Sequence, residues 1–278
     1  MILKSLFMAL LLVSCATKSP QTNSFLKSHH DLPQKHQIVD VPFIEQDDYL
    51  CAPASLGMVL GYEKSSIDLE KLKSGMMTPK SKGTYQTDLI STARGQKMLA
   101  VEISGIKDLL KEISENNPVI VFQNVGLESL PTWHYAVATG YDLKKEKIFL
   151  HSGKKAHKKE YLKIFEETWS QGGYWGLVVI SPQKLSATGS EIKHAEAAAG
   201  LENQGFYNEA QEVYQNILTR WPKSLLARIG LGNVYYYKKN YSLAVKHLKI
   251  ANLEHPDSKI AQHNLEIALK AYHKGKSL

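Results

Sequence analysis

Cysteine is scarce in this chain: its 278 residues include only Cys15 and Cys51. Patterns that mark several common enzyme classes are missing too. There is no Gly-rich phosphate loop and no Ser-centred nucleophile elbow, and the histidines show no metal-ligand spacing with cysteines or carboxylates. We therefore expect no P-loop, no serine hydrolase of the elbow type, no metal site and no cofactor.

The excess of positive over negative charge is also small. The formal net charge is +7, and much of it lies in Lys154, Lys155, Lys158 and Lys159 around His157. A solvated turn is the favoured interpretation of this stretch, over a nucleic-acid or anionic-membrane surface, and no nucleic-acid partner is expected. The hydrophobic content of 43%, with 14 Tyr and 4 Trp, predicts a folded chain with a sizeable core.

The N-terminal apolar run is short. It covers residues 6–13 behind a positive Lys4, which is too little to span a bilayer and is typical of a signal peptide. Residues 12–15, LVSC, resemble a bacterial lipobox. The resemblance implies cleavage before Cys15 and diacylation of its thiol. Residues 1–15 are thus expected to tether the mature protein to the cell envelope. Because no acidic residue follows directly, the outer membrane is favoured, on its periplasmic side. The alternative is an ordinary secretory signal.

The remaining chain divides by composition. Residues 16–37 are polar and aperiodic, which predicts a flexible tether, and residues 38–184 have the mixed pattern of an α+β domain. A Ser/Thr/Gly-rich link over 185–190 precedes an almost purely helical segment, 191–273. Within the α+β domain we expect helices over 53–62 and 106–115 and strands over 39–44, 119–122, 134–141, 147–151 and 176–180.

The C-terminal segment carries a repeat. Pro222 and Pro256 stand 34 residues apart, which matches the tetratricopeptide period. Residue Arg228 departs from the pattern, since that family has Trp there, and residues 259–273 are expected to form a capping helix. We predict an all-α, tetratricopeptide-like domain that recruits a substrate or partner protein. The residues at signature positions are Leu231, Gly232, Tyr235, Ala244, Leu248, Ala251 and Pro256.

The candidate chemistry centres on Cys51. If Cys15 is lipidated, Cys51 has no intramolecular disulfide partner in an oxidising compartment. It stands at the predicted start of the helix that Pro53 opens, where unpaired backbone N–H groups favour a thiolate. Five residues earlier, Gln46 could donate to a developing oxyanion. Far downstream, His134 begins a predicted strand that could bring its imidazole to Cys51 as general base and acid.

These segments resemble a known family. Residues 46–56, QDDYLCAPASL, resemble the nucleophile segment of the bacteriocin-type double-glycine leader peptidases, and residues 134–142, HYAVATGYD, resemble their histidine segment. The resemblance covers roughly 40–182 and looks closest to a lipoprotein subgroup with C-terminal tetratricopeptide repeats. It implies a papain-like cysteine peptidase domain with Cys51 as nucleophile, His134 as base and Gln46 as oxyanion donor. It also implies cleavage after small residues such as Gly-Gly.

Two departures from the family stand out. Ala52 replaces the usual Gly after the nucleophile, which is tolerable in helical backbone but strained at positive φ. The usual Asp before Pro at the end of the next strand is missing, since His151 and Ser152 occupy that region. Asp142 is an alternative carboxylate at the hairpin turn. The third catalytic residue is therefore left open among His151, Ser152, Asp142 or none.

Three functions follow from these residues. The favoured one is an envelope-anchored cysteine peptidase that cleaves a peptide bond through Cys51 and His134. The missing carboxylate motivates the second, a catalytically degenerate peptidase fold that serves as an envelope protein-binding scaffold. The third keeps the Cys–His pair for amide transfer or amidase chemistry on cell-wall peptides.

Overall fold

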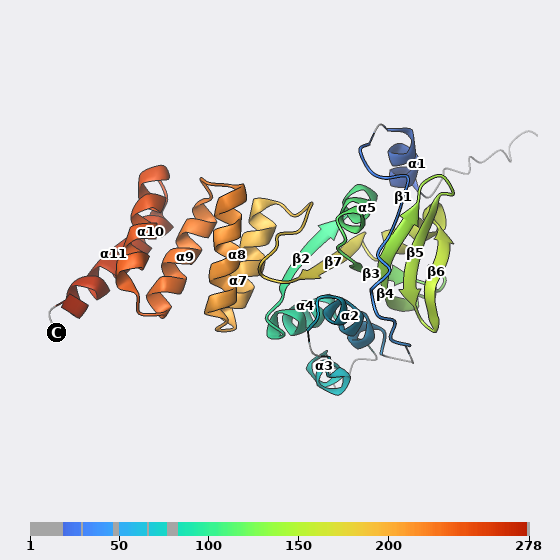
Figure 1. The fold of residues 1–278 in the computed structure, drawn as a ribbon, viewed down its shortest axis with the longest axis horizontal. Helices are drawn as coiled ribbons and strands as arrows, with labels where there is room; N and C mark the ends of the chain where they lie inside the picture. Colours follow the sequence, from blue (N-terminus) through green and yellow to red (C-terminus); the bar gives the residue numbers. More distant parts are fainter. Residues whose placement is uncertain (1–18, 29, 47–49, 66, 77–82, 277–278) are drawn as a thin grey trace, which may run out of the picture.

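The computed structural model describes residues 19–28, 30–46, 50–65, 67–76 and 83–276. The predicted signal peptide and lipobox, with Cys15, lie outside these residues. Figure 1 shows a mixed sheet-and-helix part that contains every described strand, followed by a row of helices that leads to the C-terminus. The chain is thus an α+β part followed by a helical region.

The first part is built on one sheet, in which every described pairing between strands is antiparallel. The strand order is β2-β7-β3-β4-β5-β6, and β1 pairs with β4 beyond the end of β3. Strand β7 is buried along its whole length, and β3 and β4 along most of theirs, because helices cover both faces. The strands are β1 (Lys35–Gln37), β2 (Leu99–Ser104), β3 (Val119–Asn124), β4 (Trp133–Asp142), β5 (Lys147–Ser152), β6 (Lys155–Tyr161) and β7 (Trp175–Ile180).

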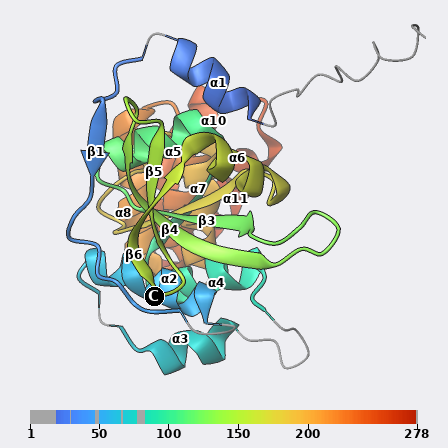
Figure 2. The same ribbon diagram turned by 90° about the vertical axis from the view of Figure 1, so that its right-hand side faces the viewer.

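Helices cover the sheet in two groups. In Figure 2, α2, α3 and α4 lie below the sheet, and α1, α5 and α6 lie above it. Helix α2 is the most deeply placed, since every residue from Ala52 to Leu60 is buried. The helices of this part are α1 (Pro20–Lys27), α2 (Cys51–Tyr62), α3 (Leu69–Met76), α4 (Gln86–Gly95), α5 (Ile106–Ser114) and α6 (Leu162–Gln171).

The strongest periodic segments were predicted correctly. Helices α2 and α5 and strands β3, β4, β5 and β7 lie where the sequence placed them. The strand expected over 39–44 is wrong, because the pairing with β4 is made earlier, by β1. Most of the lysine-rich stretch is not a turn: Lys154 lies in the β5–β6 turn, but Lys155, Lys158 and Lys159 belong to edge strand β6, with Lys155 and Lys159 exposed. Charged side chains suit an edge strand because they discourage pairing with other chains.

The flexible tether expected over 16–37 is also corrected where the structure describes it. Helix α1 and strand β1 occupy this segment, and both are attached to the domain. The fully buried carboxylate of Glu166 accepts the backbone N–H groups of Gln21 and Thr22, at 2.9 and 2.7 Å. A carboxylate at a helix N-terminus satisfies unpaired donors and interacts favourably with the helix dipole. The chain is therefore held to the domain from its first described residues.

The C-terminal region consists of helices packed in sequence order. Each neighbouring pair packs closely, and glycines allow the approach: a Cβ on Gly230 would meet the Tyr214 ring at 2.2 Å, and one on Gly232 would meet Leu248 at 2.4 Å. None of the helices in the described part of the chain is long and apolar enough to cross a membrane. The helices are α7 (Glu191–Asn203), α8 (Tyr207–Arg220), α9 (Leu225–Tyr237), α10 (Tyr241–Glu254) and α11 (Lys259–Lys276).

The joint between the two parts is firmly held. Glu112 of α5 is fully buried, and its carboxylate accepts the backbone N–H groups of Ala187 and Thr188, the Thr188 hydroxyl and the Asn117 amide, at 2.7 to 3.1 Å. Apolar residues of α7, α8 and α9 share one continuous core with the sheet. The link predicted over 185–190 is therefore an ordered connection rather than a free hinge.

Candidate active site

Cys51 is the first residue of α2, as the sequence predicted. Its side chain is half-buried, and its thiol is free. The capping residue Leu50 supplies no side-chain acceptor, so the first N–H groups of the helix lie beside the thiol without an intrahelical partner. Ala52 is buried and is not among the residues with positive φ. The added methyl therefore causes no backbone strain there.

His134 lies near the start of β4, opposite Gln123 in β3. Its Nε2 atom is 3.0 Å from the Oγ atom of Ser152, the last residue of β5. Strand β4 extends beyond β5 at this end, because the paired register between them begins only at Val137 and His151. The imidazole therefore has a hydroxyl partner, through the ring nitrogen that a neutral tautomer can use as donor.

The two other candidates for the third residue lie elsewhere. His151 is fully buried, with Nε2 at 3.1 Å from the Val41 carbonyl and Nδ1 accepting the His157 backbone N–H at 3.0 Å. Asp142 ends β4 at its other end, where it accepts the Lys145 backbone N–H at 2.9 Å. Both ring nitrogens of His151 are thus used inside the fold, and Asp142 closes the β4–β5 turn. Only Ser152, of the three, contacts His134.

Gln46 connects the elements around Cys51. Its side-chain amide Nε2 donates to Ser55 Oγ at 3.0 Å and lies 3.2 Å from the carbonyl oxygens of both Cys51 and Tyr135. Its Oε1 accepts the Gly153 N–H at 2.6 Å, and its own backbone N–H donates to the Gly153 carbonyl. The buried amide therefore joins α2, β4 and the β5–β6 turn. These contacts engage both amide hydrogens within the protein, so the oxyanion role of Gln46 stays a prediction.

The thiol and the histidine strand meet at Tyr135. Burial raises the pKa of the Cys51 thiol above its ordinary value, and hydrogen bonds from the backbone of Tyr135 and Ala52 offset this in part. Tyr135 is the neighbour of His134, so the tip of α2 lies against the start of β4. Burial, together with the positive charge of Lys158, lowers the pKa of His134 to about 4. Both directions favour a neutral Cys51 thiol and a neutral His134 imidazole at pH 7.

This neutral pair predicts a distinct pH dependence. Alkylation of Cys51 by iodoacetamide should keep accelerating from pH 7 to above pH 9, because the fraction of reactive thiolate keeps rising until the pH passes the raised pKa of the thiol. Peptide hydrolysis should fall in acid only near pH 4, where His134 gains a proton and can no longer accept one. Stopped-time alkylation and a kcat/KM profile would measure both limbs. An alkylation rate that is already level between pH 6 and 8 would indicate a preformed thiolate–imidazolium pair instead.

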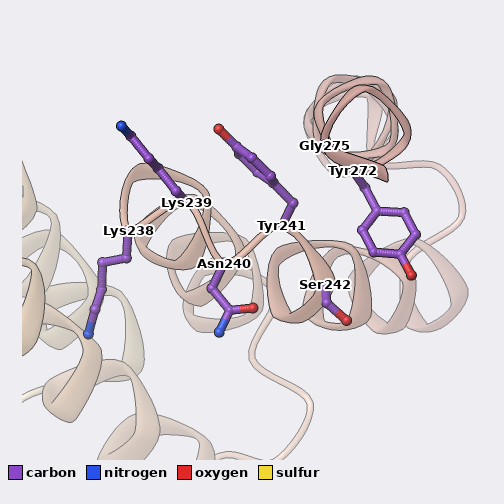
Figure 3. A pocket seen from close by; sticks show the side chains of 7 residues that line it. All are labelled: Lys238, Lys239, Asn240, Tyr241, Ser242, Tyr272 and Gly275. Atoms are coloured by element: carbon purple, nitrogen blue, oxygen red, sulfur yellow. The ribbon is translucent and has the colours of Figure 1, made fainter. Parts of the chain in front are cut away.

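No group of three or more His, Cys, Asp or Glu side chains in the described ranges is placed to hold a metal ion. A pocket of about 410 Å³ does lie in the helical region, at the α9–α10 turn and the end of α11 (Figure 3). It belongs to a different part of the chain from Cys51 and His134. Its lining residues are Lys238, Lys239, Asn240, Tyr241, Ser242, Tyr272 and Gly275.

One family model covers the part of the chain that contains these residues. Residues 38–176, half of the 278-residue chain, match the model of the Peptidase_C39 like family. The chain therefore belongs to this peptidase family. The match includes Cys51, His134 and Ser152 and ends before the helical region. No curated protein matches the chain.

Solved structures of related peptidases align with about half of the chain. A putative C39-like peptidase from Bacillus anthracis has 23% identity and a TM-score of 0.46, over 55% of this chain and 98% of its own. A double glycine motif protease from an AMS/PCAT transporter, solved with its leader peptide, has 21% identity and a TM-score of 0.39, over 52% and 93%. The peptidase domain of Streptococcus ComA has 18% identity and a TM-score of 0.42, over 50% and 98%.

Proposed function

We propose that this protein is an envelope-anchored cysteine peptidase that hydrolyses peptide bonds with Cys51 and His134. One observation carries the proposal: in a chain of a peptidase family, the Cys51 thiol lies at a helix tip against the strand that carries His134, whose ring contacts Ser152. The lipobox resemblance at Cys15 supports an attachment to the envelope membrane.

The proposed reaction begins from the neutral pair. His134 accepts the thiol proton as the Cys51 sulfur attacks the substrate carbonyl, and the imidazolium then protonates the leaving amine, which departs from a thioester. Water, deprotonated by His134, attacks the thioester and releases the carboxylic acid and the thiol. Backbone N–H groups at the start of α2 are suited to hold the oxyanion, because they point out of the helix beside the sulfur.

Ser152 is proposed as the positioning residue for His134. With Nε2–H donated to the Ser152 hydroxyl, the other ring nitrogen, Nδ1, is left as the proton acceptor. A hydroxyl supports the imidazolium less than a carboxylate does, because it carries no charge. The scaffold alternative draws on the same observation, since a weaker partner lowers the catalytic capacity of the pair.

The helical region is proposed to be tetratricopeptide-like and to recruit the substrate or a partner protein. Support comes from the 34-residue spacing of Pro222 and Pro256, and from helix hairpins whose contacts need glycine. The helical region begins near the C-terminal end of α2, whereas Cys51 is at the N-terminal end. Glu63, the C-terminal capping residue of α2, binds Lys184, which lies just before the link. Twelve helical residues span about 18 Å, so this junction lies about that far from Cys51.

Ser152 provides the test of the site. Ser152→Ala should lower kcat/KM about two- to tenfold, the loss of one hydrogen bond between neutral groups. Ser152→Asp should raise the pKa of His134, so that the acid limb of the pH profile moves upward from about 4. The measurements are kcat/KM on a fluorogenic peptide library over pH 3–9 and the alkylation rate of Cys51.

Ser74→Ala is the matched control, because its exposed hydroxyl donates to the Lys71 carbonyl within α3. If Ser152→Asp left the acid limb in place, Ser152 would not be the residue that orients His134. Partner capture that survives Cys51→Ser, together with no turnover of any peptide, would favour the scaffold.

A further inference from the structure

The β3–β4 hairpin, residues 125–133, exposes an unusual amount of apolar surface. Val125, Leu127, Leu130 and Trp133 are 49%, 70%, 73% and 47% exposed. Single exposed apolar residues are ordinary, but four on one short connection form a patch that marks an interaction site. Figure 2 shows the hairpin as the part of the sheet that projects furthest to one side.

The hairpin is held in this position rather than loosely extended. The buried side chain of Asn124 accepts the backbone N–H groups of Gly126 and Thr132, at 2.9 and 2.8 Å. The same amide donates to the Leu127 carbonyl at 3.2 Å, and Leu127 and Leu130 form a β-bridge. With its backbone bonded in this way, the hairpin keeps its apolar side chains directed outward.

Helix α6 connects the hairpin to the start of the described chain. At its C-terminal end, Gln171 accepts a hydrogen bond from Asn124 at 2.6 Å. Five residues earlier, Glu166 binds Gln21 and Thr22 of α1. Five helical residues span about 7.5 Å. In Figure 2, α6 lies between α1 and the hairpin.

The proposed lipid anchor would therefore lie within reach of this surface. Cys15 precedes Ser19, the first described residue, by four positions, which an extended chain spans in at most about 14 Å. The ordered α1 removes the slack that a flexible tether would have provided. A lipid at Cys15 would hold the α6 side of the domain, and with it the hairpin, against the bilayer.

We propose that the β3–β4 hairpin docks on the lipid bilayer surface, as a second membrane contact beside the lipid of the proposed function. Trp133 is suited to the interface, where an aromatic ring with a polar N–H is preferred. Glu128 at the tip limits the contact to headgroup depth, because burying its carboxylate in hydrocarbon is costly. Since His134 follows Trp133, this contact places the catalytic pair near the membrane, where it would meet membrane-associated peptides.

Quenching of tryptophan fluorescence by brominated lipids tests the contact. The full-length chain carrying Cys51→Ala is reconstituted in phosphatidylcholine–phosphatidylglycerol vesicles, and quenching is compared with that of the same chain carrying Trp133→Phe. Of the other tryptophans, Trp169 and Trp175 are buried and Trp221 lies at the end of α8. We expect most of the quenching to disappear with Trp133→Phe, and to fall at least threefold with Leu127→Ser combined with Leu130→Ser.

Leu226→Ser with Leu253→Ser is the matched control, because both leucines are exposed in the helical region. This pair should leave quenching unchanged, and circular dichroism should show every variant folded. Quenching that is equal with and without Trp133 would overturn the proposal. A second pair of results would also overturn it: no quenching of the Cys51→Ala chain, and a raised KM for peptides when Leu127 and Leu130 are changed in the active chain. The hairpin would then bind substrate rather than lipid. Quenching and circular dichroism are both measured on the chain carrying Cys51→Ala, so neither result depends on peptidase activity.

Discussion

Peptide hydrolysis should fall by about 10³-fold or more when either Cys51→Ala or His134→Ala is introduced. Cys51→Ala removes the sulfur that forms the acyl-enzyme. His134→Ala removes the base, and the effect is large here because the thiol is neutral: burial raises its pKa, so little thiolate exists without proton transfer. The measurement is kcat/KM on a fluorogenic peptide library at pH 7.

Two further results distinguish a working pair from two unrelated residues. The double variant should be about as slow as either single variant, because the two side chains act in the same step. Alkylation of Cys51 should also slow with His134→Ala. His263→Ala on α11, an exposed histidine, is the control and should retain full activity. If the loss of kcat/KM in the double variant equalled the product of the losses in the two single variants, a shared mechanism would be ruled out.

Glu112→Ala should destabilise the protein by about 3–5 kcal/mol, the largest effect on stability that we predict. The substitution leaves four donors without their acceptor at the joint between the sheet and the helical region: the N–H groups of Ala187 and Thr188, the Thr188 hydroxyl and the Asn117 amide. Unpaired buried donors are costly because they lose water on folding and gain nothing in return. Urea unfolding followed by circular dichroism measures the loss.

Glu115→Ala on the same region of chain is the matched control. Its carboxylate is half-exposed and pairs only with Lys111, one turn earlier in α5, so its removal should cost well under 1 kcal/mol. The protease sensitivity of the link over 185–190 should increase with Glu112→Ala and stay unchanged with Glu115→Ala. Equal unfolding midpoints for the two variants would show that the joint does not depend on Glu112.

Much of the fold could be predicted where apolar periodicity was strong. Helix α2 and strand β4 contain long buried runs, and both were placed to within a few residues; the segment after residue 190 was predicted to be almost purely helical, as it is. The short segments were not predicted. Strand β1 carries only three residues, none of them strongly apolar, and it exists because the edge of β4 beyond β3 is available for pairing.

The candidate site shows the same division. Cys51 and His134 were recognisable because each stands in a distinctive local segment. The choice among His151, Ser152 and Asp142 could not be made from the sequence, since it depends on where β4 and β5 begin to pair. The oxyanion role of Gln46 stays a prediction, and its contacts with α2, β4 and the β5–β6 turn could not be predicted, because these elements are distant in the chain.

The amino-acid sequence alone determined the class of domain, the helix that begins at Cys51 and the helical character of the C-terminal region, because these depend on local periodicity and on motifs a few residues long. Only the tertiary structure decided that Ser152 contacts His134, that α1 and β1 are attached to the domain, and that α6 connects α1 to the apolar hairpin. Each of those depends on hydrogen bonds between residues distant in the chain, such as the one between Ser152 and His134 and those between Glu166 and α1. Such pairings follow from strand register and helix packing, which no local pattern encodes.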